Sequence, residues 1–405
     1  KMKIKLDLFY YYSFVVILFL IFIVGGGIQY FLGVPNTVYT LIILSIIYLL
    51  IFFNLLSTRK LLISKVILTC IIYLFFILIS SFLNKTEPLK VILYSIFALI
   101  PLGVYYLYSI LENRHISIKP LMNSFFRILA LIQLPIILIQ KYGYDLLIKF
   151  NNSNQNISDY DAMFGSFFIK ADHSLGFFLL IYIISIIFKI RRKEIKQIPW
   201  FLLLYLTVTI FIMESNLTKL MLILVFLYYL FLWIYRKIKL LGIGIMLLIS
   251  FITFNLALKD PAINGEVQSF KKKYTPEQSF IAFEKGYAKR PQIVITYVSK
   301  TPIKWFGDGP YDYYNIFTGK FKQTLNFSQL IWTYNDLGIF GLLTVILLAF
   351  FLIKSLSLDP ESKKLFFLVI LMYLFMTTVF SDLAMTLSLL LIRNNKIESL
   401  DIRES

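Results

Sequence analysis

Residues 37–56 read TVYTLIILSIIYLLIFFNLL, a run of 20 residues without a single charged side chain. Because an α-helix rises 1.5 Å per residue, such a run covers about 30 Å, the thickness of the hydrocarbon core of a bilayer. The run is apolar on every side and shows no strict alternation, which favours a membrane-spanning helix over a strand of a β-barrel.

The rest of the chain has a similar composition. Hydrophobic residues make up 59% of the 405 residues, about 239 side chains, enough for about twelve spans of roughly 20 residues. Charged residues make up 15%, whereas a soluble protein has about 25%. The single cysteine, Cys70, cannot form an intrachain disulfide. The composition excludes a soluble enzyme, a disulfide scaffold and a disordered chain, and predicts an all-α polytopic membrane protein with one transmembrane domain, residues 1–405.

Hydropathy in windows of about 19 residues predicts twelve membrane-spanning helices. Their approximate limits are 9–25, 37–56, 61–82, 90–111, 121–140, 175–190, 199–213, 219–235, 240–257, 328–353, 365–380 and 382–393. Basic residues cluster in every second short loop, which places about 23 of the 40 lysine and arginine residues on one side. Positive residues collect on the cytoplasmic side, so both termini are predicted to be cytoplasmic. Topology then accounts for most of the net charge of +18, and no nucleic-acid partner is expected.

Two polar segments are predicted to lie on the outer face, at residues 141–174 and 258–327. The second is a large extracytoplasmic loop, and residues 259–327 within it hold 11 basic and 6 acidic side chains. Loops of this length that carry no repeats are usually functional. The chemistry is therefore expected outside the cell membrane.

The large loop carries the first cluster of candidate site residues. Its members are Lys289, Arg290, Trp305, Gly307, Asp308, Gly309 and Tyr311. An arginine can bind phosphate oxygens bidentately, and lysines add point charges. The two glycines of the Gly-Asp-Gly-Pro turn are expected to let the backbone bend and approach a ligand. Trp305 and Tyr311 suit the faces of sugars or, equally, the membrane interface.

Two further clusters lie at the outer ends of predicted spans. In the first, Glu214 and Lys219 flank the segment Ser215-Asn-Leu-Thr218. Lys219 either reaches the interface with its ammonium group or faces a cavity that holds anionic head groups. In the second, Asp172 and His173 open the sixth span. An aspartate beside a histidine can form a proton acceptor, or the aspartate can simply cap the helix.

Several common catalytic signatures are missing from the sequence. It contains no P-loop, no dinucleotide-binding glycine pattern, no CxxC and no His-Glu-x-x-His motif. The two histidines are too few for a histidine-rich metal site. Neither a metal nor an organic cofactor is therefore predicted.

In their order along the chain, these clusters resemble the O-antigen polymerase and O-antigen ligase (Wzy-like) superfamily. The matching segments are Phe164-Gly165-Ser166 with Asp172-His173-Ser174, Ser215-Asn-Leu-Thr218-Lys219, Arg290, Trp305-Phe-Gly307-Asp-Gly309-Pro310, and Asp336-Leu-Gly338-Ile-Phe-Gly341. The resemblance covers roughly residues 160–345, and the N-terminal spans are similar in hydropathy alone. Ligases of the family place a histidine shortly before the Gly-x-x-Gly span, where this chain has Asn326-Phe327-Ser328. The resemblance therefore favours the polymerase branch.

The resemblance implies a GT-C-like (class B) bundle and a metal-independent glycosyltransferase in the bacterial inner membrane. Its substrates would be oligosaccharide repeat units linked to undecaprenyl diphosphate, and a flippase and a chain-length regulator would be its partners. Because charge develops on the leaving diphosphate, fixed cations would stabilise it, with Arg290 and Lys219 first and Lys289 in support. The candidate proton acceptors are Asp172, His173, Glu214 and Asp308.

Three other functions fit the same sequence. One is a ligase that transfers glycan to another acceptor, one a lipid-linked oligosaccharide flippase or a twelve-span carrier, and one a membrane scaffold for glycan assembly. Carriers place ionisable residues at mid-membrane and seldom have an external loop as long as residues 258–327. The polar residues of this chain instead collect near the outer surface, which favours the enzyme.

Overall fold

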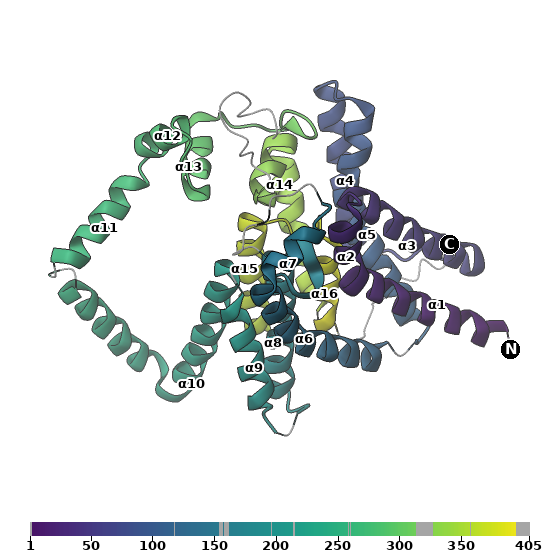
Figure 1. Ribbon diagram of the computed structural model, residues 1–405, viewed down its shortest axis with the longest axis horizontal. Helices are drawn as coiled ribbons and strands as arrows, with labels where there is room; N and C mark the ends of the chain where they lie inside the picture. The colour runs from purple at the N-terminus through teal and green to yellow at the C-terminus, as the bar shows by residue number, and fades with distance from the viewer. Residues whose placement is uncertain are drawn as a thin grey trace.

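The computed structural model describes residues 2–116, 118–153, 157, 162–195, 197–213, 215–257, 259, 261–312, 327–356 and 358–393 (Figure 1). These residues form helices and connecting segments and contain no β-strand. The helices are α1 (Met2–Phe19), η1 (Leu20–Val24), α2 (Gly25–Leu32), α3 (Asn36–Thr58), α4 (Lys65–Leu83), α5 (Pro88–Asn113), α6 (Lys119–Tyr142), α7 (Tyr144–Leu147), η2 (Ile148–Phe150), η4 (Gly165–Lys170), α8 (Ala171–Arg191), α9 (Trp200–Ile212), α10 (Asn216–Ala257), α11 (Pro261–Lys273), α12 (Pro276–Glu284), α13 (Arg290–Lys300), α14 (Gln329–Ser355), α15 (Pro360–Met376), α16 (Leu383–Leu389) and η7 (Leu390–Ile392).

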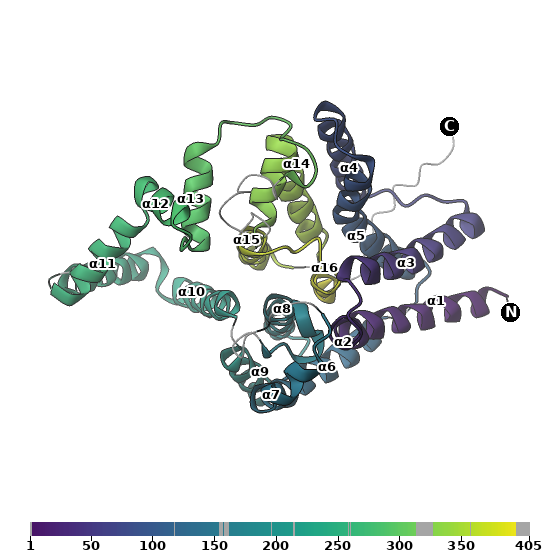
Figure 2. The ribbon, with the colours of Figure 1, turned by 45° about the horizontal axis from the view of Figure 1, so that its top comes forward.

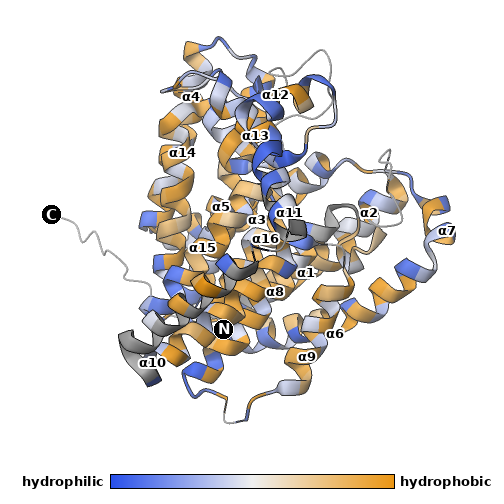
Figure 3. Ribbon diagram, turned by 90° about the vertical axis from the view of Figure 1, so that its left-hand side faces the viewer, coloured by the Kyte–Doolittle hydropathy of each residue, from blue (hydrophilic) through white to orange (hydrophobic). Residues whose placement is uncertain are grey.

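The chain is an α-helical, multi-pass membrane protein. Within the described part, eight helices are long and apolar enough to cross a bilayer, and two shorter apolar helices accompany them. The eight are Leu6–Leu32, Asn36–Thr58, Lys65–Leu83, Pro88–Asn113, Lys119–Tyr142, His173–Arg191, Asn216–Tyr235 and Gln329–Ser355. Figure 3 shows apolar residues along the bundle and polar residues gathered around α12, α13 and the connecting loops. Each of the twelve predicted segments overlaps a helix, but among the described residues eight helices, not twelve, are long and apolar enough to cross a bilayer.

One predicted connection is wrong. The sequence predicted two spans separated by a basic loop at residues 236–239, whereas α10 is a single helix of 42 residues. A straight helix of this length measures about 63 Å, twice the hydrocarbon core of a bilayer, and Figure 1 shows that the ribbon of α10 bends in its middle. Lysine and arginine are good helix formers, so a cluster of charge marks a break in hydropathy without breaking the backbone.

Helix α8 lies at the centre of the bundle, between α10 and α16 (Figures 1 and 2). Its membrane segment is 78% buried, against 28% for the first part of α10. A helix that is apolar on all sides can face either lipid or other helices, and α8 is enclosed by other helices. On the other side of the molecule, α4 packs between α5 and α14. This arrangement places the two ends of α8 against several helices that are distant in sequence.

Side chains at helix starts fix where several helices begin. Ser64, Ser328, Asp359 and Asp382 each accept a hydrogen bond from a backbone N–H in the first turn of α4, α14, α15 and α16. Such caps satisfy amide groups that lack a partner within the helix.

Candidate functional site

His173 and Arg290, separated by 117 positions in sequence, meet at one end of the bundle. Arg290 Nη1 lies 3.5 Å from His173 Nε2. Because a guanidinium can only donate, Nε2 must accept, and a neutral His173 then carries its proton on Nδ1. Arg290 is exposed and its guanidinium carbon lies 5.6 Å from the centre of the Phe327 ring. The contact with His173 uses one of the five N–H donors of the Arg290 guanidinium, so the guanidinium remains able to bind an oxyanion.

The neighbouring residue, Ser174, ties the start of α8 to α16. Ser174 Oγ donates a hydrogen bond of 3.0 Å to Asp382 Oδ2, while Asp382 Oδ1 accepts one of 2.9 Å from Met385 N. Asp382 is 7% exposed, so both of its oxygens are used inside the protein. Sequence reasoning missed this link, since Ser174 and Asp382 are 208 positions apart and nothing in either segment marks the other.

Close packing brings the start of α10 to the same end of α8. A Cβ added at Gly176 would lie 2.1 Å from Thr218 Oγ1, so no larger residue fits without movement. The Thr218 hydroxyl is in turn 2.8 Å from Tyr373 Oη and 2.9 Å from Ser215 Oγ. Lys219, the next residue, is half-buried.

The structure describes the other candidate residues of these clusters, Asp172, Glu214 and Lys289, only in part. The backbone of Asp172 belongs to the first turn of α8, but its side chain lies outside the described part of the structure. Glu214 lies outside the described residues altogether. Lys289 is exposed beside Arg290, and its backbone N–H donates to Gln292 Oε1 at 3.0 Å, which fixes the start of α13.

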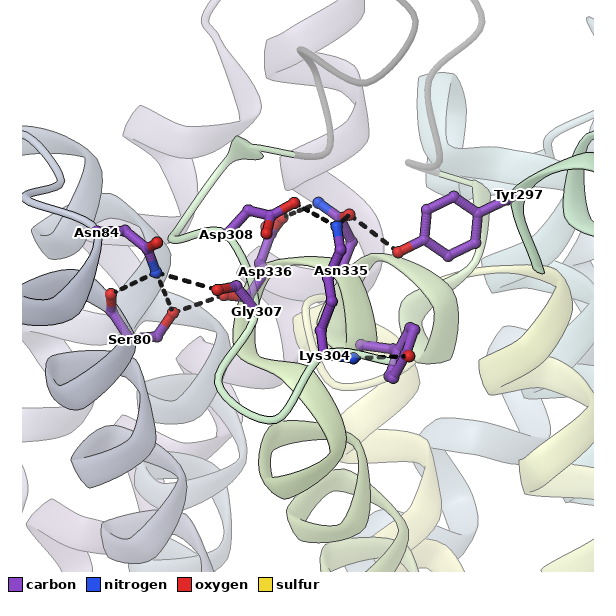
Figure 4. A network of polar contacts seen from close by, with 9 residues as sticks. Ser80, Asn84, Tyr297, Lys304, Gly307, Asp308, Asn335 and Asp336 are labelled. Carbon is purple, nitrogen blue, oxygen red and sulfur yellow. Dashed lines mark hydrogen bonds and ion pairs between the residues drawn. The ribbon is translucent and has the colours of Figure 1, made fainter. Parts of the chain in front are cut away.

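The Gly-Asp-Gly turn forms a second cluster, at a break in α14 (Figure 4). Gly338 has φ 72° and ψ −162° in the middle of α14, which interrupts the helical hydrogen bonds. The backbone before α14 replaces them: Asp308 N donates to Asn335 O at 2.9 Å, and Gly309 N donates to Asp336 O at 3.0 Å. On the other side of the break, Ile339 N donates to the carbonyl of Lys304 at 2.9 Å. The polar backbone groups released by the break are thus satisfied within the protein.

This geometry corrects the expectation that the glycines of the turn let the backbone approach a ligand. A Cβ at Gly307, which has φ 70°, would lie 2.3 Å from the carbonyl carbon of Asp336. Asn84 Nδ2 donates to Gly307 O at 3.1 Å, and Ser80 Oγ donates to Asp336 O at 2.6 Å. The backbone of the turn approaches α14 and is fastened to α4, so its glycines serve the fold.

Side chains around the break form a closed polar network (Figure 4). Lys304 Nζ donates to Asn335 Oδ1 at 2.8 Å and also forms an ion pair with Asp308. Tyr297 Oη donates to the same Asn335 oxygen at 2.9 Å, and Asn335 Nδ2 donates to Asp336 Oδ1 at 3.0 Å. Burial, with the nearby Tyr334 and acidic groups, raises the pKa of Tyr297, which keeps its hydroxyl protonated as this bond requires.

The two aromatic candidates of the loop, Tyr311 and Trp305, differ in their contacts and exposure. Tyr311 N donates to Asp336 Oδ2 at 3.0 Å, and the Tyr311 ring packs edge-on against Tyr94, with 5.4 Å between ring centres. Trp305 remains 60% exposed. Trp305 is therefore free to contact a sugar or the interface, whereas Tyr311 anchors the loop.

The structure thus divides the predicted site residues between two groups. His173, Arg290, Lys289 and Lys219 lie around the start of α8, and Asp308, Trp305, Gly307, Gly309 and Tyr311 lie at the break in α14. Helix α13 connects the groups, because Arg290 begins it and Tyr297 lies seven residues further on, about 10 Å along the axis. In the described part of the chain, no group of three or more histidine, cysteine or carboxylate side chains could hold a metal ion. No family model, curated protein or solved structure matches the chain.

Proposed function

We propose that the chain is a glycosyltransferase that polymerises oligosaccharide repeat units linked to a polyprenyl diphosphate, and releases the lipid diphosphate. The observation that supports the proposal best is the contact between His173 and Arg290. The two residues come from separate sequence clusters, and they combine an oxyanion-binding fork with a proton acceptor at one end of a membrane bundle.

In the proposed reaction, a hydroxyl oxygen of one lipid-linked unit bonds to the anomeric carbon of another. The bond from that carbon to the diphosphate oxygen breaks, and the electron pair leaves with the diphosphate. Arg290, with Lys219 and Lys289, binds the phosphate oxygens and stabilises the charge that develops there. When Arg290 turns to the diphosphate, Nε2 of His173 is released and accepts the proton of the attacking hydroxyl.

The other candidate bases stay in the proposal with less support. Asp308 forms an ion pair with Lys304 in the network at α14, which engages its carboxylate. The side chain of Asp172 and the whole of Glu214 lie outside the described residues, so their roles remain predictions from the sequence. His173 is therefore the first choice for the base.

The proposed enzyme is a GT-C-like bundle that crosses the bacterial inner membrane twelve times, with both termini in the cytoplasm. The bend in α10 supports this number, because it allows the two halves of α10 to form separate crossings (Figure 1). With His173 on the outer face, the repeat units would come from a flippase, and a chain-length regulator would act on the product. Transfer to another acceptor would make the enzyme a ligase, which the same residues could serve.

The decisive experiment uses the purified full chain in detergent with a lipid-linked repeat unit. The expected result is a ladder of longer lipid-linked glycans and release of polyprenyl diphosphate. Arg290→Ala should abolish the ladder, and Arg290→Lys, which keeps the charge but loses the fork, should give intermediate activity. Lys300→Ala is the matched control, because it removes an exposed cation at the other end of α13.

Three results would count against the proposal. A normal ladder from Arg290→Ala would remove Arg290 from the reaction. Movement of labelled substrate across a vesicle membrane without any new glycosidic bond would identify a flippase or carrier. Glycan transferred to lipid A core, protein or wall polymer, with no ladder, would identify a ligase.

A further inference from the structure

A small pocket lies at the end of α8 opposite to His173. It is small and open on one side, and its polar lining consists of Lys119, Ser185, Lys189, Glu194 and Arg393. Sixteen residues of α8 separate His173 from Lys189, about 24 Å along the axis. The pocket therefore lies at the opposite end of α8 from the proposed active site.

Positive charge dominates this pocket. Lys189 is half-buried and donates from Nζ to Asn123 Oδ1 at 2.8 Å. Lys119 lines the same pocket, where its positive charge acts against that of Lys189. Glu194 is the one carboxylate among the described residues of the lining; its charge favours that of Lys189, and its Oε1 lies 3.4 Å from Arg192 Nη1. An anion placed between the cations would remove their repulsion.

Arg393 supplies an unused hydrogen-bond donor at the same place. Its side chain is 4% exposed, Nη2 lies 2.9 Å from Glu112 Oε2, and the guanidinium stacks over the rings of Tyr105 and Tyr108 at 4.3 and 5.2 Å. Nη1 is buried without a hydrogen-bond partner among the described residues. A buried guanidinium N–H without an acceptor is costly, and Arg393 is one of the residues that line the pocket.

We propose that this pocket binds a phosphate group, with Lys119 and Lys189 as point charges and Arg393 Nη1 as a donor. Three cations around one small cavity, set between the ends of membrane helices, suit a phosphate diester or monoester. The phosphate comes from the head group of an anionic phospholipid in the adjacent leaflet, or from the aqueous phase. The predicted topology makes this the cytoplasmic side, where positive residues and anionic lipids face one another.

The test is a binding titration of the purified full chain in detergent, followed by native mass spectrometry. The probes are phosphatidylglycerol, phosphatidylcholine as a zwitterionic comparison, and inorganic phosphate. We expect phosphatidylglycerol to bind at one site with a lower Kd than phosphatidylcholine, or inorganic phosphate to bind on its own. The first result assigns the site to lipid and the second to free phosphate.

Variants decide whether the binding belongs to this pocket. Lys119→Gln and Lys189→Gln should each raise the Kd about tenfold, the loss expected for one charge-assisted contact. Lys119 is exposed, so its replacement should leave the fold intact even if Lys189→Gln does not. Lys364→Gln, an exposed lysine in α15, should leave the Kd unchanged. Equal Kd values in all three variants, or no binding of either phosphate probe, would overturn the proposal.

Discussion

The backbones of Gly338 and Trp305 run so close together that a Cβ at position 338 would lie 2.3 Å from the carbonyl carbon of Trp305. The same close approach occurs at Gly307, where an added Cβ would lie 2.3 Å from the carbonyl carbon of Asp336. The break in α14 and the end of the large loop therefore depend on each other. Neither would keep its conformation if the other were moved.

Gly338→Ala should destabilise the protein by about 2–4 kcal/mol. The φ of 72° is unfavourable for alanine, and the added methyl group would push Trp305 away. Thermal unfolding in detergent measures the effect. Gly27→Ala is the control, because its Cβ would meet only Phe31 Cδ2 at 3.8 Å. Equal melting temperatures for the two variants would show that the loop is not fastened to α14.

Gly176→Ala should separate α8 from α10 and cost about 1–3 kcal/mol, because its Cβ would overlap the Thr218 hydroxyl. Removing that hydroxyl in the double variant Gly176→Ala/Thr218→Ala should recover part of the loss. Residues in contact give non-additive changes of this kind. Strictly additive free energies of unfolding would contradict the contact between the two helices.

His173→Gln should slow glycan elongation by roughly 10²–10⁴-fold, the usual contribution of a general base. The loss should appear in kcat with KM little changed, since the proton is accepted in the transition state. His115→Gln replaces the other histidine, which is exposed, and should keep full activity. Full activity in His173→Gln would move the role of base to one of the three carboxylates.

Asp359 should make stability depend on acidity. Burial alone would raise the pKa of its carboxyl group, but hydrogen bonds from Ser362 and the charge of Arg191 outweigh burial and lower it. A carboxyl with a lower pKa in the folded state stabilises the fold above about pH 4 and loses that contribution as the pH falls through its folded pKa. The melting temperature should therefore fall on acidification.

The variant Asp359→Asn isolates this contribution. It should be less stable than the parent chain at neutral pH and should lose less stability on acidification. Glu277→Gln, an exposed acid in the first turn of α12, should behave like the parent chain. An unchanged acid response in Asp359→Asn would show that its contacts with Ser362 and Arg191 do not stabilise the fold.

The sequence predicted the helical membrane bundle because hydropathy is a local property. Every predicted span overlaps a helix, yet the loop expected at residues 236–239 is helical in the structure. The basic residues at 236–239 indicate a favourable position relative to the membrane, but they do not indicate whether the helix ends there. The number of crossings therefore stays a prediction even though the helices are shown.

Contacts between distant segments could not be predicted in the same way. The bond between Asp382 and Ser174 depends on how α16 packs against α8. The glycines of the large loop were noted for a close approach, and the approaching partner proved to be α14. A sequence shows that a position needs a small residue, while the neighbour that requires it is fixed by tertiary packing.

Helix α8 carries His173 at one end and Lys189 at the other, and its membrane segment is 78% buried. A hydrogen-bonded rod enclosed on all sides moves as one body, so a shift at either end displaces both. If inner phosphate changes the affinity for the lipid-linked donor, the donor must change the affinity for phosphate by the same factor. If both proposals hold, the central helix would link a phosphate site at one end of the bundle to the glycan site at the other.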